Sequence, residues 1–178
     1  MNKKLLMSTI VLLVLSMMII SPVMAITKDP NYWDHVVFDM FDYPPHKLWY
    51  ADDVMHIKDM HWAGSYEGTL APLTAGGTFD VWFEHLSLNL KTGKGTYSGK
   101  WLITIPGEGT VAGSARGKLT VTGPYSGTTS GTYIGTYGTD AYEGVKKMGP
   151  YTLSYEMDPA TGWFASAELW ATGTIIWP

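Results

Sequence analysis

One short motif recurs along the chain and limits what it can fold into: a tyrosine with a glycine two residues away on each side. Full copies are GSYEG at 64–68, GTYSG at 95–99, GPYSG at 123–127 and GTYIG at 131–135, and DAYEG at 140–144 is a partial copy. In a β-strand, residues two apart share one face. Each copy therefore places one large ring between two bare patches of backbone, where a sheet can bend sharply.

The sequence after Gly64 alternates between apolar and polar residues, as strands do, and turn residues separate the alternating stretches. In FDVWF (79–83) the apolar residues share one face, whereas the leucines from Leu86 onward take the opposite parity, so a β-bulge is expected near Glu84–His85. Hairpin turns are expected at KTGK (91–94), PGEG (106–109), TGP (122–124) and DPATG (158–162). The chain is therefore predicted to be all-β and mostly antiparallel.

Pairing these strands through their turns places large side chains beside small ones. Counted from the turns, Trp101 is expected opposite Ala115, and Tyr133 beside Gly113. A ring can cover the backbone of a neighbouring glycine, and the glycines let the sheet curl until it closes and leaves no free edge. We therefore predict a closed antiparallel β-barrel of about eight strands, mostly in meander order.

The first residues have the layout of a secretory signal peptide. Within residues 1–25, a short basic start precedes an apolar run from Leu5 to Ile20, and small residues lead to a cleavage site after Ala25. An uncleaved N-terminal anchor is the alternative. The protein is accordingly expected to be secreted or extracytoplasmic.

Two further segments follow the signal peptide. Residues 26–62 are aromatic and acidic, and Pro44–Pro45 excludes a continuous helix across that point. This segment is expected to form an N-terminal aromatic arm, and its end, DVMHIKDMHW (53–62), could supply a first strand. Residues 63–178 are expected to form the β-barrel domain. The chain has no cysteine, so the fold must hold without disulfides.

Charge narrows the range of partners. The formal net charge is −4, and Arg116 is the single arginine. Both features argue against nucleic acid and against an anionic membrane surface. The strand faces expected to point outward are rich in Thr, Ser and Lys, which disfavours an outer-membrane barrel. After signal cleavage we expect no membrane association. The sequence is compatible with a monomer or an oligomer.

The stretch GTDAYEGVKKMGPYTL (138–153) resembles the strand–turn signature of the allene-oxide-cyclase/dirigent-like barrels. Gly138, Thr139, Tyr142, Gly144 and Gly149 carry the resemblance, with weaker support from residues 95–121, and Asp140 stands where the family usually has a second glycine. The resemblance implies a closed barrel of about eight antiparallel strands with an apolar lumen. It carries over no catalytic residue, because no positions here match the active-site pattern of the cyclase.

The main functional hypothesis is a secreted, non-catalytic barrel that binds a small apolar or amphipathic ligand. A barrel of about eight strands leaves room inside for side chains or for one small ligand. Alternatives are a cyclase- or isomerase-type enzyme that uses the lumen, and a carbohydrate-binding or cell-surface module that stacks exposed rings on a glycan. The predicted ligand-binding residues are Phe83, Tyr97, Trp101, Tyr133 and Tyr155.

The remaining candidate residues are histidines and carboxylates. MHIKDMH (55–61) offers ligands that suit copper, but on one strand His56 and His61 would point to opposite faces. Glu84 and His85 could act as acid and base only if the bulge turned both toward one pocket. Asp52–Asp53 lacks the loop of a dedicated calcium site. No nucleophile motif is present. Catalytic residues are therefore unknown, and no metal or cofactor is expected.

Overall fold

The computed structural model of the chain describes residues 27–42, 44–70 and 74–178. The signal peptide expected at 1–25 lies outside these residues. One short 3-10 helix, η1, spans Asp140–Tyr142. The strands are β1 (Thr27–Phe41), β2 (Lys47–Ala51), β3 (Val54–Lys58), β4 (Met60–Thr69), β5 (Thr74–Asn89), β6 (Lys94–Ile105), β7 (Gly109–Gly123), β8 (Ser126–Gly138), β9 (Lys146–Asp158) and β10 (Trp163–Trp177). In the part of the chain described here, no helix has the length and apolar character needed to span a membrane.

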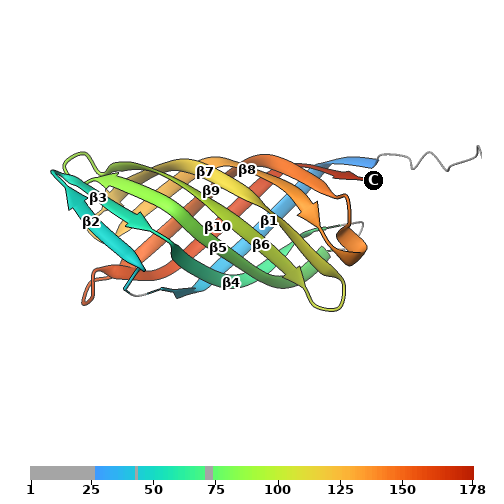
Figure 1. Cartoon of the computed structure of the whole chain (residues 1–178), viewed down its shortest axis with the longest axis horizontal. Coiled ribbons are helices and arrows are strands. Elements are labelled where there is room, and N and C mark those ends of the chain that lie inside the picture. Colours follow the sequence, from blue (N-terminus) through green and yellow to red (C-terminus); the bar gives the residue numbers. More distant parts are fainter. Residues whose placement is uncertain (1–26, 43, 71–73) are drawn as a thin grey trace, which may run out of the picture.

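The strands close into an antiparallel barrel (Figure 1). From β4 to β10, each strand pairs with the next one in the sequence. β1 completes the ring by pairing with β4 on one side and with β10 on the other. Eight strands form the barrel and two lie outside it. The predicted all-β barrel and its meander order are confirmed.

The two outside strands, β2 and β3, form a hairpin that lengthens one end of the barrel (Figure 1). β3 pairs with Leu86–Asn89 of β5, whereas β4 pairs with the earlier residues of the same strand. Asp59 separates β3 from β4 and has a left-handed φ of 55°, a conformation that Asp tolerates better than most residues. The chain therefore bends at Asp59 and continues along the same edge of β5.

The segment 26–62 differs from the arm expected from the sequence. Residues 27–41 form β1, a full strand of the barrel that pairs on both edges. The strand expected within 53–62 is present as β3 and the start of β4, and the boundary expected after Trp62 falls inside β4. The aromatic residues of β1 therefore belong to the barrel wall, whereas Trp49 and Tyr50 belong to the outside strand β2.

The turn between β6 and β7 is tighter than the sequence suggests. Ile105 pairs with Gly109, whereas the expected register, with Trp101 opposite Ala115, would pair Ile105 with Val111. Gly107 within the turn has a left-handed φ of 78°, which lets the chain reverse over few residues. The register of β6 with β7 is thus shifted by two residues. Such a shift keeps every side chain on its predicted face, because faces alternate with a period of two.

This shift changes the partner of Trp101, and a separate two-residue shift between β7 and β8 changes the partner of Tyr133, but both rings stay over small residues. Trp101 lies opposite Gly113, and Tyr133 lies opposite Ala115. A Cβ atom built on Gly113 would lie 2.5 Å from the Trp101 ring and 2.0 Å from the carbonyl oxygen of Ile134. No side chain fits there, which supports the interpretation of the glycine–tyrosine motif as a packing and bending device.

We expect Gly113→Ala to lower the free energy of unfolding by about 1–3 kcal/mol, because its methyl group would overlap both the Trp101 ring and a carbonyl oxygen. Gly76→Ala is the matched control, since the nearest atom to a Cβ built there is 3.9 Å away, and its effect should stay within about 0.5 kcal/mol. Urea unfolding followed by circular dichroism measures both. Equal effects at the two glycines would contradict the packing role.

The bulge predicted at Glu84–His85 is present as a break in register between Phe83 and His85. Phe83 and Leu86 are both buried on either side of it, while Glu84 and His85 are exposed. The bulge therefore lets Leu86 point into the barrel, although its parity along β5 is opposite to that of Phe83. The hydrophobic core lies inside the barrel, where inward-facing side chains of all eight barrel strands meet.

Candidate functional site

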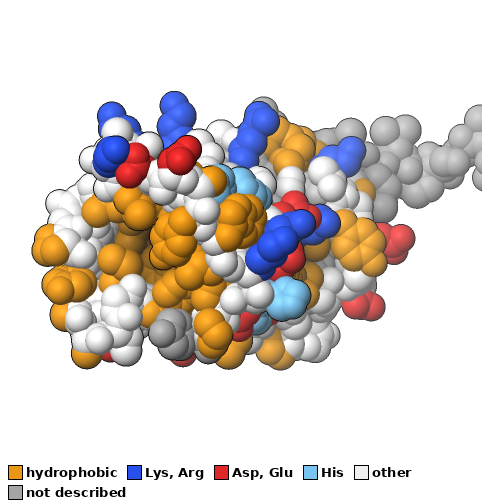
Figure 2. Space-filling view, turned by 60° about the vertical axis from the view of Figure 1, so that its left-hand side comes forward, with side chains coloured by type: hydrophobic (Ala, Val, Ile, Leu, Met, Phe, Trp, Pro, Cys, Tyr) orange, Lys and Arg blue, Asp and Glu red, His pale blue; other side chains and the backbone are white. Residues whose placement is uncertain are grey.

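An apolar cavity lies in the barrel lumen and receives side chains from all eight barrel strands. Figure 2 shows hydrophobic side chains around a hollow at the end of the barrel that carries the β2–β3 hairpin. About 50 Å³ of the cavity is open to the centre of a water-sized molecule, whereas one water needs roughly 10–15 Å³ by this measure. The structure places all five predicted ligand-binding residues on the cavity wall: Phe83, Tyr97, Trp101, Tyr133 and Tyr155.

Aromatic contacts hold these walls in place. The rings of Phe83 and Tyr97 meet edge to face, with centroids 5.6 Å apart. Trp101 and Tyr133 meet in the same way at 6.2 Å. Edge-to-face pairs of this kind favour one ring orientation over others. These contacts therefore fix how the rings of the cavity wall are oriented.

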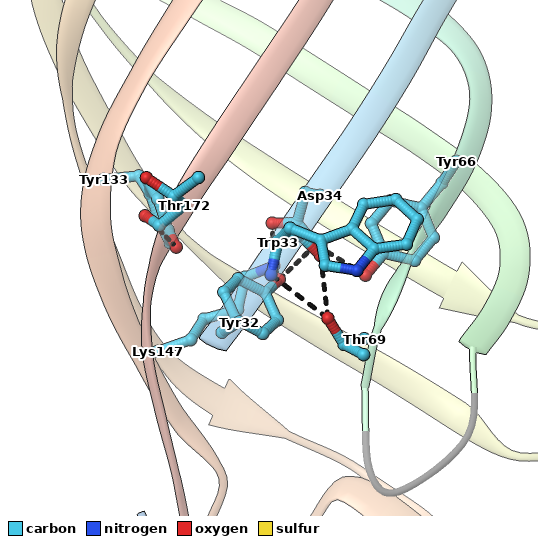
Figure 3. Close-up of polar contacts among 8 residues, drawn as sticks. All are labelled: Tyr32, Trp33, Asp34, Tyr66, Thr69, Tyr133, Lys147 and Thr172. Carbon is cyan, nitrogen blue, oxygen red and sulfur yellow. Dashed lines mark hydrogen bonds and ion pairs between the residues drawn. The ribbon is translucent and has the colours of Figure 1, made fainter. Parts of the chain in front are cut away.

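The deep end of the cavity is polar. Lys147, near the start of β9, and Asp34, in the middle of β1, both line the cavity, and Lys147 Nζ lies 2.8 Å from Asp34 Oδ2. Their side chains are only 1% and 5% exposed. Two hydroxyl groups complete the cluster (Figure 3): Tyr66 donates to Asp34 over 2.6 Å, and the Tyr32 hydroxyl contacts both Asp34 and Lys147. The charges are thus paired and hydrogen-bonded, as buried charges need to be.

Aromatic rings surround the ammonium group of Lys147. Its Nζ lies 4.8 Å from the centroid of Trp101, 4.9 Å from that of Tyr32 and 5.5 Å from that of Tyr133, all within the range of cation–π attraction. Burial lowers the pKa of Lys147, and the neighbouring Asp34 carboxylate opposes that shift. Burial and the charge of Asp34 both raise the pKa of Tyr66. Tyr66 therefore remains a neutral hydrogen-bond donor to the carboxylate.

A second polar group lies within the lumen. The Tyr97 hydroxyl contacts the Tyr151 hydroxyl and is 3.1 Å from Thr129 Oγ1. Burial is the main cause that raises the pKa of Tyr97 and of Tyr151. These hydroxyl groups satisfy one another, so the wall between the cavity mouth and Lys147 carries no charge.

Neither Asp34 nor Lys147 is among the residues predicted from the sequence. Lys147 has the same parity as Tyr151 and Tyr155 along β9, so alternation alone places it inside the barrel. Asp34 shares its parity with buried Val36 in β1. A charged residue at an inward-facing position indicates a polar site in the lumen. For Asp34, this indication depends on residues 27–41 being a strand of the barrel.

The histidines lie on the outer surface and form no shared site. His56 and His61 both point outward, contrary to the expectation of opposite faces, because the bend at Asp59 resets the alternation. His61 stacks on Trp82 and lies 2.9 Å from Asp80. His56 stacks on Trp49, and its ring centroid is 5.6 Å from that of His85. Glu84 pairs with Lys100 at 2.7 Å. Among the described residues, no group of three or more His, Asp or Glu could hold a metal ion.

Exposed aromatic rings come from separate strands rather than from one row. Tyr50, Trp82, Tyr137 and Trp170 are each at least 40% exposed and belong to β2, β5, β8 and β10, and Tyr125, 44% exposed, lies in the turn between β7 and β8. Trp170 stacks on His35 with centroids 4.0 Å apart. A glycan-binding face would need several such rings side by side, so the surface gives this alternative less support than the lumen gives to ligand binding.

Comparison of the chain with protein-family models, with curated proteins and with solved structures gives no match. What the lumen can do therefore follows from its own residues. Its aromatic walls can enclose an apolar molecule, and its buried Lys147–Asp34 pair can meet a polar end of that molecule.

Proposed function

We propose that the protein binds a small apolar or amphipathic molecule in the barrel lumen without changing it chemically. The apolar cavity, with ordered aromatic walls and a buried polar pair at its deep end, is the observation that carries this proposal. Concave apolar sites with a few placed polar groups are the usual form of small-molecule sites. The resemblance of residues 138–153 to allene-oxide-cyclase/dirigent-like barrels supports an apolar lumen of the same kind.

The dye N-phenyl-1-naphthylamine, which fluoresces strongly in apolar surroundings, tests the proposal. We expect saturable binding of the dye to the purified protein and its displacement by dodecan-1-ol. Leu169 lines the cavity and is half-buried, so Leu169→Trp should fill the space and weaken dye binding by at least about tenfold, or 1.4 kcal/mol. Ile134→Trp is the control, because Ile134 is exposed on the outer face of β8.

Two results would contradict the proposal: dye fluorescence that never saturates, or equal dye affinity in the two tryptophan variants. Circular dichroism of each variant shows that the barrel is intact. A loss of dye binding in Ile134→Trp as well would point to the outer surface rather than to the lumen.

One observation supports the alternative function, a cyclase- or isomerase-type enzyme. Two titratable side chains, Asp34 and Lys147, line a cavity that is not filled, and acid–base chemistry needs such groups beside the substrate. Recovery of the bound molecule separates the two functions. A binding protein returns the molecule unchanged, whereas an isomerase returns a product of the same mass with a different chromatographic retention.

A further inference from the structure

Two tryptophans on the cavity wall have no hydrogen-bond partner for their indole N–H. Trp62 and Trp101 are each 3% exposed and line the cavity, and the Nε1 atoms of both are buried and unpaired within the described residues. Two other indole groups do have acceptors: Trp163 donates to the carbonyl oxygen of Asp42 over 2.8 Å, and Trp170 donates to Glu168 over 3.2 Å. Buried indole N–H groups usually find an acceptor.

The two indoles belong to one row of the barrel wall. Trp62 of β4 pairs with Val81 of β5, and Val81 pairs with Trp101 of β6. Neighbouring strands are about 4.8 Å apart, so the two tryptophan backbones are about 10 Å apart. Val81 between them is smaller than either ring and also lines the cavity. The row therefore places one tryptophan on each side of the smaller Val81.

Among the described residues, no acceptor lies within hydrogen-bond distance of either indole nitrogen. Trp62 packs against Phe38, Phe83 and Phe164, with centroids 4.5–5.6 Å away. Trp101 packs against Phe79 and Tyr133, and the Tyr133 hydroxyl donates to the carbonyl oxygen of Thr172 over 3.2 Å. A water molecule would need two to four polar partners, which the phenyl rings do not provide. A molecule in the lumen that carries an acceptor oxygen would satisfy these N–H groups.

We propose that the lumen selects neutral, largely apolar molecules that carry a carbonyl oxygen, such as ketones or esters, and that this oxygen accepts a hydrogen bond from Trp62 or Trp101. The inference rests on the proposed binding function and names the class of ligand. A carboxylate fits less well, because Lys147, the cation of the lumen, is already paired with Asp34 at 2.8 Å. A carbonyl oxygen accepts without bringing a donor or a charge that the apolar wall could not satisfy.

Octan-2-one and its alkene isostere 2-methyloct-1-ene are the matched probes, since they differ in the acceptor alone. Competition against N-phenyl-1-naphthylamine should show octan-2-one binding about 5- to 10-fold more tightly than the alkene, the effect expected of one hydrogen bond. In ¹⁵N–¹H spectra of the intact protein, octan-2-one should move the indole N–H signal of Trp62 or Trp101 downfield. The signals of Trp163 and Trp170 should stay in place.

Two variants and one control complete the test. Trp62→Phe and Trp101→Phe retain an aromatic ring without the N–H, and at least one of them should abolish the preference for octan-2-one. Trp82→Phe is the control, because Trp82 is exposed on the outer face of β5. The spectra of the unmodified protein carry the test even if a variant fails to fold.

The outcomes distinguish the two proposals. If the dye binds, but octan-2-one and the alkene compete equally and neither indole signal moves, the inference about the ligand class is wrong while lumen binding stands. If neither the dye nor either probe binds, the binding function itself is wrong, and the inference falls with it.

Discussion

Asp34→Leu is expected to lower the free energy of unfolding by about 3–5 kcal/mol, because it leaves the buried ammonium group of Lys147 without its counter-charge. The same substitution removes the acceptor that Tyr66 uses at 2.6 Å. Urea unfolding at neutral pH, followed by circular dichroism, measures the loss. The slope of the unfolding free energy against urea concentration should be the same in the variant and in the unmodified protein. A cost near that of an exposed ion pair, up to about 1 kcal/mol, would contradict the burial of the pair.

The double variant Asp34→Leu/Lys147→Met is the matched control. It replaces both charges with apolar side chains of similar length, and such exchanges of a buried pair are often neutral or stabilising. We therefore expect the double variant to recover most of the stability lost by Asp34→Leu. Recovery would assign the loss to an unpaired charge, and a double variant as unstable as the single one would assign it to disturbed packing.

The single variant should also respond to pH in a defined direction. With Asp34 gone, burial lowers the pKa of Lys147 with no carboxylate to oppose it, since these are the two opposing influences in the intact protein. The unfolded chain then binds more protons than the folded chain below the ordinary lysine pKa, so stability rises as the pH is raised toward that value. Urea midpoints at several pH values for the single and double variants would show this rise in the single variant alone.

Alkaline solution is expected to unfold the barrel within about one to two pH units above pH 10. Burial is the largest cause of a raised pKa in seven buried tyrosines, five of which are Tyr32, Tyr66, Tyr97, Tyr133 and Tyr151. Above the ordinary tyrosine pKa, the unfolded chain loses these protons while the folded chain keeps them. Each tyrosine then subtracts about 1.4 kcal/mol of stability per pH unit, so five of them exhaust a stability of about 5–15 kcal/mol. Lys147 acts in the opposite direction, but it is a single group.

Near-ultraviolet phenolate absorbance and far-ultraviolet circular dichroism, recorded together, measure this transition. The absorbance of the buried tyrosines should appear together with the loss of β-structure. Tyr66→Phe should make the decline of stability with pH shallower by about 1.4 kcal/mol per unit, whereas Tyr137→Phe, at an exposed position of β8, should leave it unchanged. Phenolate absorbance from these tyrosines in a barrel that is still folded would contradict the prediction.

The class of fold and the ring of lumen residues could be predicted because both depend on parity. The glycine–tyrosine spacing determines which side chains share a face, and a two-residue error in register leaves that assignment intact. Trp101 and Tyr133 therefore line the lumen even though their cross-strand partners differ from those expected. The turn lengths that set the register depend on local backbone conformations such as that of Gly107, which alternation does not encode.

The polar end of the lumen could not be predicted for a related reason. Asp34 lies in β1, whose pairing partners β4 and β10 are separated from it by the β2–β3 hairpin and by most of the chain. Alternation within residues 27–41 gives no information on what those partners are. The prediction that His56 and His61 point to opposite faces is wrong for a similar reason: one left-handed residue, Asp59, reverses the parity between them. Both errors arise where a single local or long-range contact overrides a repeating pattern.

The pairing of β1 with β10 has a consequence for how the protein is made. From β4 to β10 each seam joins strands that follow one another, so it can form locally as a hairpin during synthesis, and the β1–β4 seam spans only the β2–β3 hairpin. The final seam joins Thr27 to Trp177 and must wait until the last strand has been synthesised. Until then the growing sheet carries two unprotected edges, on β1 and on its newest strand, which can recruit foreign strands.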